Sequence, residues 1–510
     1  MEWRRTDSGE FVRYATFDTW LRYKQSLVEG FSKKMRSNCG CGVLLLLGAS
    51  FFAVLGCGSR TGTPTTTANV HNEWTWKSGS SSVNQAGIYG ALNVAESADT
   101  PGARSYPAHW TDASGNFWLF GGYGYDSTGQ SGDLNDLWEY SNGEWKWVGG
   151  SSQTEQGGSY GLLGVAAADN WPGARYEPVS WTDSSGNLWL FGGLGIDGAG
   201  NRNNLNDLWK FSQGQWAWMA GSSNTGDQKI PGVYGTQGVP DSANTPGNRI
   251  DAQGWADTSG NIWLFGGEGP DVNGDIGLLN DLWEFTQGKW VWMGGSNTYN
   301  PFGIYGTKGA ASPTNMPGAR VDSATWRDAS GTFWLFGGEG NDLNGVLCEK
   351  TAGPCELSDL WKYSKGQWTW VSGADVVEQP GSYGAQGVAA ANNVPGGRES
   401  PATWIDSSGN LWLFGGVGFD SSVAPGVFGD LNDLWKYSGG EWIWVSGSNS
   451  ATQTAVYGTE GAAAAVNMPG GRDRAVGWTD MSGNLWLFGG INSQYVADGG
   501  VFNDLWEYQP

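Results

Sequence analysis

The chain has 510 residues, of which 85 are glycine and 33 are tryptophan, and its formal net charge is −22. Charged residues make up 15% and aromatic residues 14% of the chain, which excludes a disordered protein, and glycine without a triplet period excludes collagen. The negative charge argues against nucleic acid as a partner, and two histidines leave little for a histidine-rich metal site. The chain is long enough for several domains or for one large closed architecture.

The N-terminal segment, residues 1–56, has the pattern of an export signal. A basic flank precedes an uncharged apolar run, residues 42–56, which is too short and too rich in glycine and alanine for a comfortable membrane span. The run ends in Val-Leu-Gly before Cys57, which resembles a bacterial lipobox and implies cleavage before Cys57 and its lipidation. An ordinary signal peptide with an incidental cysteine is the alternative. Residues 1–34 are unusual for a signal, so Met35 is a second candidate for the translation start.

Residues 57–72 are rich in glycine, serine, threonine and proline, and we interpret them as a tether behind the lipidated cysteine. Export to an oxidising compartment also bears on the two remaining cysteines, Cys348 and Cys355, which stand in one short loop. We predict a local disulfide between them, with two free thiols as the alternative. The expected location is the bacterial cell envelope, lipid-anchored at the outer membrane or cell surface.

The rest of the chain, residues 73–510, is one unit repeated six times. Every repeat contains Pro-Gly-x-Arg, then Trp-Leu-Phe-Gly-Gly, then Asp-Leu-Trp, and five repeats end in Trp-x-Trp. The sixth repeat stops before its Trp-x-Trp, and the missing piece stands at the other end of the chain, in residues 73–76. A linear stack gives no reason to divide a unit in this way. A closed ring does, because the divided unit joins the first strand to the last.

Each repeat holds four short runs with strand character, bounded by turn residues. In the first repeat these runs lie near His109–Asp112, Phe117–Gly121, Asp136–Tyr140 and Glu144–Val148. We therefore predict an all-β fold, a six-bladed β-propeller of four-stranded blades whose ring is closed by the N-terminal strand Glu-Trp-Thr-Trp.

The repeat also resembles a known family. The Gly-Gly that closes the second strand, the Asn-Asp-Leu-Trp of the third strand and the Trp that opens the fourth are similar to the kelch repeat. The resemblance covers residues 73–510. Proteins of this kind include the propeller of galactose oxidase and a bacterial N-acetylneuraminate epimerase.

Residues that occur in all six repeats are interpreted as scaffold. We expect each arginine of Pro-Gly-x-Arg to bond backbone carbonyls at a blade junction, because six equal copies seldom serve one substrate. We expect the aspartate of Asp-Leu-Trp to cap a turn. The tryptophans are expected to pack between blades.

Two connections vary in length, the one from the second to the third strand and the one from the fourth strand to the next first strand. Antiparallel strands alternate in direction, so both connections open on the same face, which we call the variable face. Binding residues concentrate on variable loops carried by a rigid scaffold. We therefore assign function to the variable face.

The kelch resemblance implies that the first strand is innermost, so the second residue after each repeat's arginine lies near the channel mouth on this face. The residue after Gly-Gly adds to it. The candidate ligand mouth is Tyr106, Glu177, Asp251, Asp322, Arg474, Glu268 and Glu339. Such a mouth suits a sugar or a cation, and a solvated acidic rim is the alternative.

Metal sites are only weakly indicated. Asp271, Asn273 and Asp275 resemble a calcium loop, but the glycine is displaced by one position and the closing glutamate is missing. The copper chemistry of galactose oxidase uses two histidines, two tyrosines and a crosslinked cysteine, whereas this chain keeps only His109 beyond the tether. We predict no copper-radical oxidase and no cofactor.

The uniform scaffold and the single variable face favour a monomeric lipoprotein that binds a protein or a glycan without catalysis. No nucleic acid partner is expected. The alternative is a carbohydrate-active enzyme resembling the epimerase, with carboxylates and Arg474 at the mouth, in which two carboxylates in different environments share the acid and base roles.

Overall fold

The computed structural model describes residues 72–226, 229–345, 355–422, 426–493 and 500–510, with the backbone of two short strands near the N-terminus. These two strands, β1 (Glu2–Arg5) and β2 (Phe11–Tyr14), pair antiparallel. They belong to a separate unit from the one that contains the repeats. The predicted lipidation site Cys57 and the predicted disulfide partner Cys348 lie outside the described residues, so both stay predictions.

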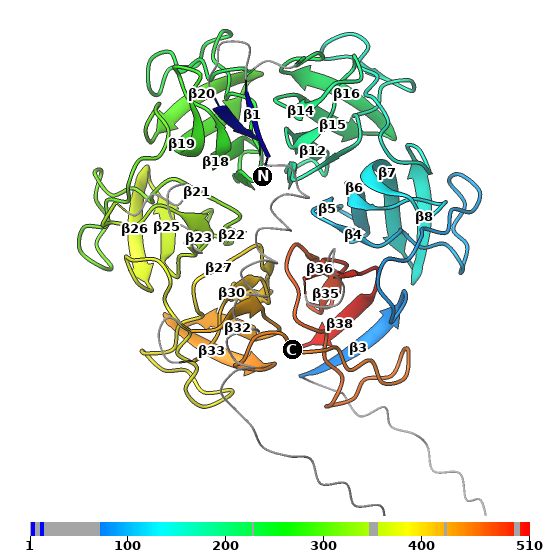
Figure 1. The fold of residues 1–510 in the computed structure, drawn as a ribbon, viewed down its shortest axis with the longest axis vertical. Coiled ribbons are helices and arrows are strands. Elements are labelled where there is room, and N and C mark those ends of the chain that lie inside the picture. The colour runs from blue at the N-terminus through cyan, green and yellow to red at the C-terminus, as the bar shows by residue number, and fades with distance from the viewer. Residues whose placement is uncertain are drawn as a thin grey trace, which may run out of the picture. The chain divides into compact units, whose positions relative to one another are not determined.

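Every repeat forms an antiparallel sheet in which four main strands are hydrogen-bonded in order (Figure 1). In the first repeat the strands are β5 (Ala108–Thr111), β6 (Phe117–Tyr125), β7 (Ser131–Ser141) and β8 (Glu144–Gly149). Among the described residues there is no helix, and hence none that is long and apolar enough to cross a bilayer. The prediction of an all-β fold is confirmed.

The next four repeats follow the same plan. The second holds β11 (Val179–Thr182), β12 (Leu188–Phe191), β15 (Leu208–Ser212) and β16 (Gln215–Ala220). The third holds β17 (Gln253–Ala256), β18 (Ile262–Pro270), β19 (Ile276–Thr286) and β20 (Lys289–Gly294). The fourth holds β22 (Ala324–Arg327), β23 (Phe333–Phe336), β25 (Leu360–Ser364) and β26 (Gln367–Ser372). The fifth holds β28 (Ala402–Ile405), β29 (Leu411–Phe414), β32 (Leu434–Ser438) and β33 (Glu441–Ser446).

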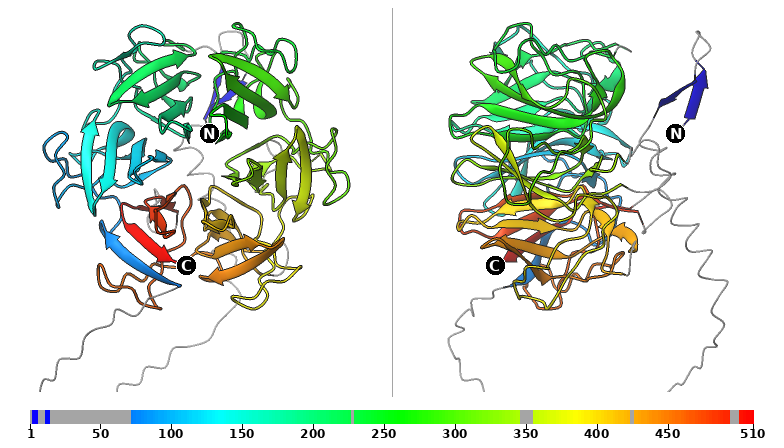
Figure 2. Two further views of the ribbon diagram at one scale, coloured as in Figure 1. Left: turned by 180° about the vertical axis from the view of Figure 1, so that it is seen from behind. Right: turned by 90° about the vertical axis from the view of Figure 1, so that its left-hand side faces the viewer.

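The sixth sheet combines both ends of the repeat region. It consists of β34 (Val476–Thr479), β35 (Leu485–Phe488), β38 (Leu505–Gln509) and the N-terminal strand β3 (Glu73–Ser78). Strand β3 pairs antiparallel with β38, with Trp74 opposite Tyr508 and Trp76 opposite Trp506. Figures 1 and 2 show the blue β3 beside the red β38. The segment that the sixth repeat lacks in sequence is therefore supplied by the N-terminal strand.

The Gly-Gly pair interrupts the regular pairing of the second strand: the register shifts beside it in the continuous strands β6 and β18, and the strand ends before it in the other four repeats. In the second repeat, β12 and β13 (Leu194–Ile196) lie on either side of the pair and belong to different sheets. Gly121 and Gly122 adopt φ angles of 64° and 94°. A Cβ on Gly121 would lie 2.8 Å from the carbonyl oxygen of Arg175 in the next repeat. Both the left-handed backbone and this close approach require glycine.

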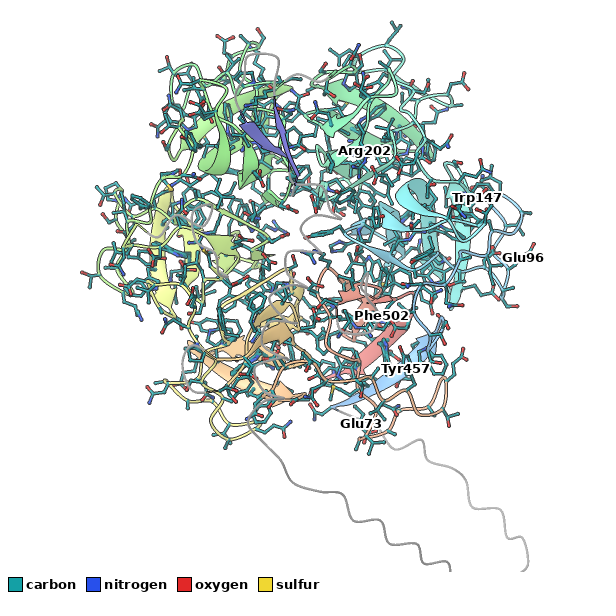
Figure 3. All side chains as sticks on the ribbon, in the orientation of Figure 1. Glu73, Glu96, Trp147, Arg202, Tyr457 and Phe502 are labelled. Atoms are coloured by element: carbon teal, nitrogen blue, oxygen red, sulfur yellow. The ribbon has the colours of Figure 1, made fainter. Side chains whose placement is uncertain are left out.

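The hydrophobic core lies between neighbouring sheets, and Figure 3 shows the side chains that fill these spaces. One cluster joins Trp110 and Phe120 of the first repeat to Leu190 and Trp209 of the second, and similar clusters join each later pair. A further cluster joins the first repeat to the sixth. The largest fully buried side chains are all tryptophans: Trp74, Trp138, Trp209, Trp216, Trp283, Trp361, Trp368, Trp412, Trp435, Trp442, Trp478 and Trp506. The expected packing role of the tryptophans is confirmed.

A buried ion pair stands at the centre of each repeat. Arg104 donates two hydrogen bonds of 2.7 Å to the two carboxylate oxygens of Asp136, and it also bonds the carbonyls of Gly102 and Gly121. The Tyr89 hydroxyl and the Trp138 indole N–H donate to the same carboxylate. This arrangement agrees with the expected structural role of the arginine. The expectation that the aspartate caps a turn is wrong, because Asp136 is the counter-ion of Arg104.

The same set of tyrosine, arginine, aspartate and tryptophan, which we call the quartet, recurs in every repeat. Its other copies are Tyr160/Arg175/Asp207/Trp209, Tyr234/Arg249/Asp281/Trp283, Tyr305/Arg320/Asp359/Trp361, Tyr383/Arg398/Asp433/Trp435 and Tyr457/Arg472/Asp504/Trp506. The quartet explains why the tyrosine and the arginine are 15 residues apart in all six repeats, since both must reach one buried carboxylate.

Candidate functional site

The predicted mouth positions form a hydrogen-bonded series that passes from repeat to repeat. The backbone N–H of Glu177 donates to the carbonyl of Tyr106, and the N–H of Tyr106 donates to the carbonyl of Arg474 in the sixth repeat. Three further bonds link the equivalent residues of repeats three to six. The described residues thus show five of these bonds, and the set is Tyr106, Glu177, Asp251, Asp322, Ser400 and Arg474, which we call the mouth ring.

All six residues of the mouth ring have left-handed backbones, with φ between 51° and 58°. This conformation costs a residue with a Cβ roughly 1–2 kcal/mol, and glycine adopts it without that cost. None of the six positions is glycine. The chain therefore keeps a side chain at each position against a backbone preference. Such strain is concentrated at functional sites in proteins, which makes the mouth ring the leading candidate for the site.

Side chains of the mouth ring from distant repeats meet one another. The Tyr106 hydroxyl donates to a carboxylate oxygen of Asp322 at 3.2 Å, which connects the first repeat to the fourth. The guanidinium carbon of Arg474, in the sixth repeat, lies 4.5 Å from the centre of the Tyr106 ring. The phenol therefore lies between a cation and a carboxylate, and all three side chains occupy the same place in the fold.

Burial makes the mouth carboxyl groups weaker acids. Burial and the charge of Asp322 raise the pKa of Glu177 well above its ordinary value, against the opposing effect of Arg474. Burial and the charges of Asp322 and Glu177 do the same to the pKa of Asp251. Burial and the charge of Glu399 raise the pKa of Asp322 to about 6. The carboxyl groups of the mouth therefore bind a proton at a higher pH than ordinary carboxyl groups do.

Arg474 is the cation of this site. Burial lowers the pKa of its guanidinium, but the neighbouring carboxylates of Asp473 and Glu399 outweigh this effect, so the net pKa lies above its ordinary value and the group stays charged. It bonds Asp473 at 2.5 Å and lies 3.9 Å from a carboxylate oxygen of Glu399. These contacts fix the guanidinium in the mouth.

The remaining predicted residues fall into two places. Glu268 acts electrostatically on Glu177 and Asp251, so it belongs to the mouth. Glu339 instead joins Glu356 and Glu399, and one carboxylate oxygen from each lies within 4.8 Å of the others. Three oxygen ligands at this separation have the chemistry that Ca²⁺ uses in proteins. The sequence did not indicate this trio.

The sequence reasoning missed Glu399 and Asp473. Both stand one position before the mouth ring residues Ser400 and Arg474, and the equivalent residues in the other repeats are Ser105, Tyr176, Ile250 and Val321. This position varies in chemistry as much as the mouth ring itself. This variation between repeats is the feature of the sequence that could have indicated Glu399 and Asp473.

The weak calcium candidate has a clear structural use in the turn. One carboxylate oxygen of Asp271 accepts the backbone N–H groups of Asn273 and Asp275, and the other accepts the N–H of Tyr299. The equivalent Asp126 makes the same pattern with Thr128 and Gln130. These contacts support the turn role that the repeated aspartate indicates.

One cysteine of the predicted disulfide is described. Cys355 is disulfide-bonded and only 1% exposed, in a small apolar cluster with Leu357 and Val321. It directly precedes Glu356 of the carboxylate trio. A covalent link at Cys355 therefore holds the chain beside that trio.

Comparisons with known proteins show likeness in solved structures alone, since no protein-family model and no curated protein matches the chain. A structure titled "Structure of YjhT" is 14% identical over 80% of this chain and 95% of that chain, with a TM-score of 0.44. Another, titled "Novel fungal alcohol oxidase with catalytic diversity among the AA5 family, in complex with copper", is 10% identical over 83% and 76%, with a TM-score of 0.42. Both are too distant to assign a reaction or ligand to this chain.

Proposed function

We propose that residues 73–510 form a six-bladed propeller of the kelch type whose ring is closed between the sixth and first repeats. Three observations support the closure. Strand β3 completes the sixth sheet, a core cluster joins the first repeat to the sixth, and Tyr106 bonds Arg474 through the backbone. In this arrangement the mouth ring surrounds the central channel at the variable face.

We propose further that the mouth binds a glycan without catalysis. The observation that carries this proposal is the convergence of Glu177, Asp251, Asp322 and Arg474 around the Tyr106 phenol. Sugar hydroxyl groups both donate and accept hydrogen bonds, so they suit a site that offers several carboxyl groups, a phenol and a guanidinium together.

Aromatic side chains beside the mouth add to this chemistry. The ring of Tyr176 lies 6.3 Å from that of Tyr106 and 5.8 Å from that of Tyr123. Aromatic rings combine a large apolar surface with a polar tip, which fits the alternating apolar and polar faces of a sugar ring. The three tyrosines extend the mouth towards the first and second repeats.

The test is glycan binding to the full chain by array and by calorimetry. The informative variants are Glu177→Ser and Asp251→Ser, because Ser400 occupies the same left-handed position in the fifth repeat. Each should weaken glycan binding about tenfold or more, since a hydrogen bond to a charged group contributes roughly 1.5–3 kcal/mol. The matched control is Glu96→Gln, a change of equal charge at an exposed loop residue on the outer edge (Figure 3). Glycan binding that both serine variants retain in full would overturn the proposal, as would an array without any bound glycan.

The raised pKa of Asp322 favours a second candidate, a carbohydrate-active enzyme. A carboxyl group with a pKa of about 6 is suited to both gain and lose a proton near neutral pH, and the Tyr106 hydroxyl lies within hydrogen-bond distance of it. Turnover of a reducing sugar, followed by NMR, tests this candidate. Activity that Asp322→Asn abolishes and Glu96→Gln preserves would replace the binding proposal, and no turnover of any sugar that binds would rule out the enzyme.

The location is also a proposal. The lipobox-like sequence before Cys57 supports an exported chain that a lipid anchors to the cell envelope. Metabolic labelling with a radioactive fatty acid should mark the protein, and Cys57→Ser should remove both the label and the membrane association. An unlabelled wild-type protein would refute the lipid anchor and leave the binding proposal intact.

A further inference from the structure

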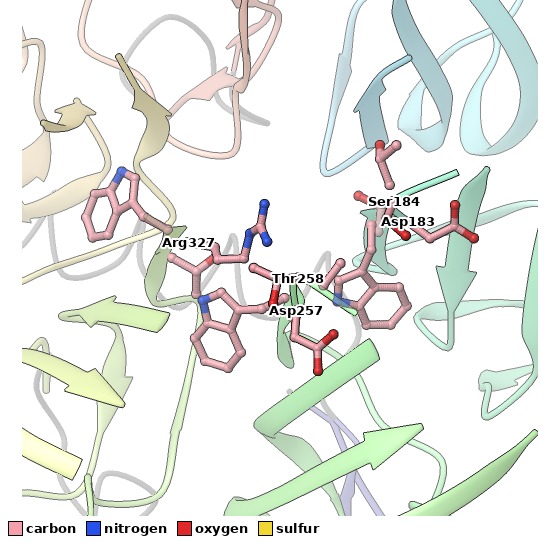
Figure 4. A pocket seen from close by; sticks show the side chains of 13 residues that line it. Asp183, Ser184, Asp257, Thr258 and Arg327 are labelled. Carbon is pink, nitrogen blue, oxygen red and sulfur yellow. The ribbon is translucent and has the colours of Figure 1, made fainter. Parts of the chain in front are cut away.

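A cavity of about 440 Å³ lies at the other end of the innermost strands, away from the mouth ring. It is lined by the last residues of β11, β17 and β22 and by the turns that follow β11 and β17 (Figure 4). Its size falls within the range of small-molecule sites in proteins, roughly 300–1,000 Å³. The invariant length of these turns gave no reason to expect a site here.

Arg327 is the chemically distinct residue of this cavity. It ends β22, where the other five repeats have Thr111, Thr182, Ala256, Ile405 and Thr479. It is exposed, and among the described residues it has neither a hydrogen bond nor an ion pair. Figure 4 shows its side chain extending from the strand among the other lining residues. An unrepeated cation without a counter-ion has no evident role in the scaffold.

Two further donors at the cavity wall lack acceptors. The indole N–H groups of Trp181 and Trp255 are buried and have no hydrogen-bond partner, and these side chains are only 4% and 3% exposed. In three other repeats the equivalent indole donates to a backbone carbonyl of the next repeat, as Trp110 does to Trp189 at 2.9 Å. The repeat-to-repeat bond is therefore absent at the two junctions that border the cavity, and it is also absent in the sixth repeat, where the indole N–H of Trp478 has no partner.

The two acidic residues of the wall do not serve as acceptors for these donors. Both oxygens of Asp257 accept hydrogen bonds from its own turn, from the N–H groups of Ser259, Asn261 and the Trp263 indole. Asp183 is engaged in the same way in the second repeat. The cavity thus combines a guanidinium that has no counter-ion among the described residues with carboxylates that are already satisfied.

We propose that this cavity binds a small carboxylate-bearing molecule of about the size of a sugar acid. The planar guanidinium of Arg327, which is the cation among the residues that line the cavity, matches a carboxylate with two parallel hydrogen bonds. Thr258 and Thr325 also line the cavity, and their hydroxyls suit the polar body of such a ligand. The site is separate from the mouth ring and does not depend on the function proposed there.

The experiment is calorimetry of the full chain with sodium D-glucuronate, neutral D-glucose and inorganic phosphate as probes. Arg327→Thr removes the charge and introduces the residue that three other repeats carry at this position, so the fold is expected to tolerate it. The matched control is Lys365→Gln, which removes a cation from an exposed turn where Gln213 and Gln287 hold the same left-handed backbone in other repeats.

Glucuronate is expected to bind about tenfold or more tightly than glucose, and Arg327→Thr should weaken it by about the same factor. Lys365→Gln should leave the affinity unchanged. Equal affinity of wild type and Arg327→Thr for glucuronate, or no binding of glucuronate, overturns the proposal. Phosphate that binds more tightly than glucuronate overturns the assignment of a carboxylate ligand.

Discussion

Replacing Asp136 by asparagine tests the role of the quartet most directly. The Asp136 side chain is fully buried and accepts two hydrogen bonds from Arg104, one from the Tyr89 hydroxyl at 2.6 Å and one from the Trp138 indole at 2.6 Å. Asparagine keeps the volume but removes the charge and turns an amide N–H₂ towards one of the donors. Because this leaves the guanidinium buried without a counter-ion, we expect Asp136→Asn to lower the free energy of unfolding by about 3–5 kcal/mol.

Removing one donor from the same quartet should cost less. Tyr89→Phe deletes a single hydrogen bond to a charged acceptor and leaves the ion pair intact, so the expected loss is about 1.5–3 kcal/mol. Guanidinium chloride denaturation followed by tryptophan fluorescence and far-ultraviolet circular dichroism measures both losses. Asp169→Asn, at an exposed loop residue, is the matched control and should change stability by at most about 0.5 kcal/mol. A loss below about 1 kcal/mol for Asp136→Asn would refute the quartet as the main polar support of the repeat.

Three further predictions concern titration and the closing strand. The pKa of Asp322 is about 6 in the fold and 3.8 ordinarily, so the contribution of this carboxyl group to stability is complete below pH 4 and is lost as the pH rises through 6. In pH-dependent denaturation, Asp322→Asn should flatten this fall in stability and should raise the free energy of unfolding at pH 7 by on the order of 1–3 kcal/mol. Burial lowers the pKa of His109 to about 4, so its NMR resonance should stay that of a neutral imidazole at pH 5. For the same reason the free energy of unfolding should fall as the pH drops from 6.5 to 4. An NMR titration of His109 with its midpoint near pH 6.5 would contradict the burial of this side chain. Trp74→Ala should cost about 3–5 kcal/mol by denaturation, because this indole is 1% exposed and packs on Phe414 and Tyr508; a change under 1 kcal/mol would show that β3 contributes little to the sixth sheet.

Much of the fold was predictable because the sequence contains the same unit six times. The displaced Trp-x-Trp predicted that β3 would complete the sixth sheet, and the register of Trp76 opposite Trp506 bears this out. The role of Asp136 was not predictable in the same way. It lies 32 residues from Arg104, and equal spacing across repeats shows that two positions belong to the unit but not that they touch.

One part of the candidate functional residues could also be predicted from the repeats, and another part could not. The mouth ring could be identified because its residues, such as Tyr106, Asp322 and Arg474, differ from repeat to repeat, whereas the scaffold residues are the same in all six repeats. The cavity at the opposite end was not predicted from the sequence, because the residues beside it include Trp181 and Trp255, which occur in every repeat and were interpreted as scaffold. They differ from Trp110, Trp326 and Trp404 in lacking the hydrogen bond to the next repeat. Only side-chain placement reveals that difference.

The left-handed backbone of the mouth ring has a consequence for how such a protein diversifies. Each of the six positions takes its conformation from main-chain hydrogen bonds to its neighbours, and tyrosine, glutamate, aspartate, serine and arginine all adopt it. The identity of one side chain is therefore largely uncoupled from the backbone that presents it. Selection can therefore exchange the residues at these six positions one at a time. Such exchanges alter the ligand preference and leave the backbone of the repeats unchanged.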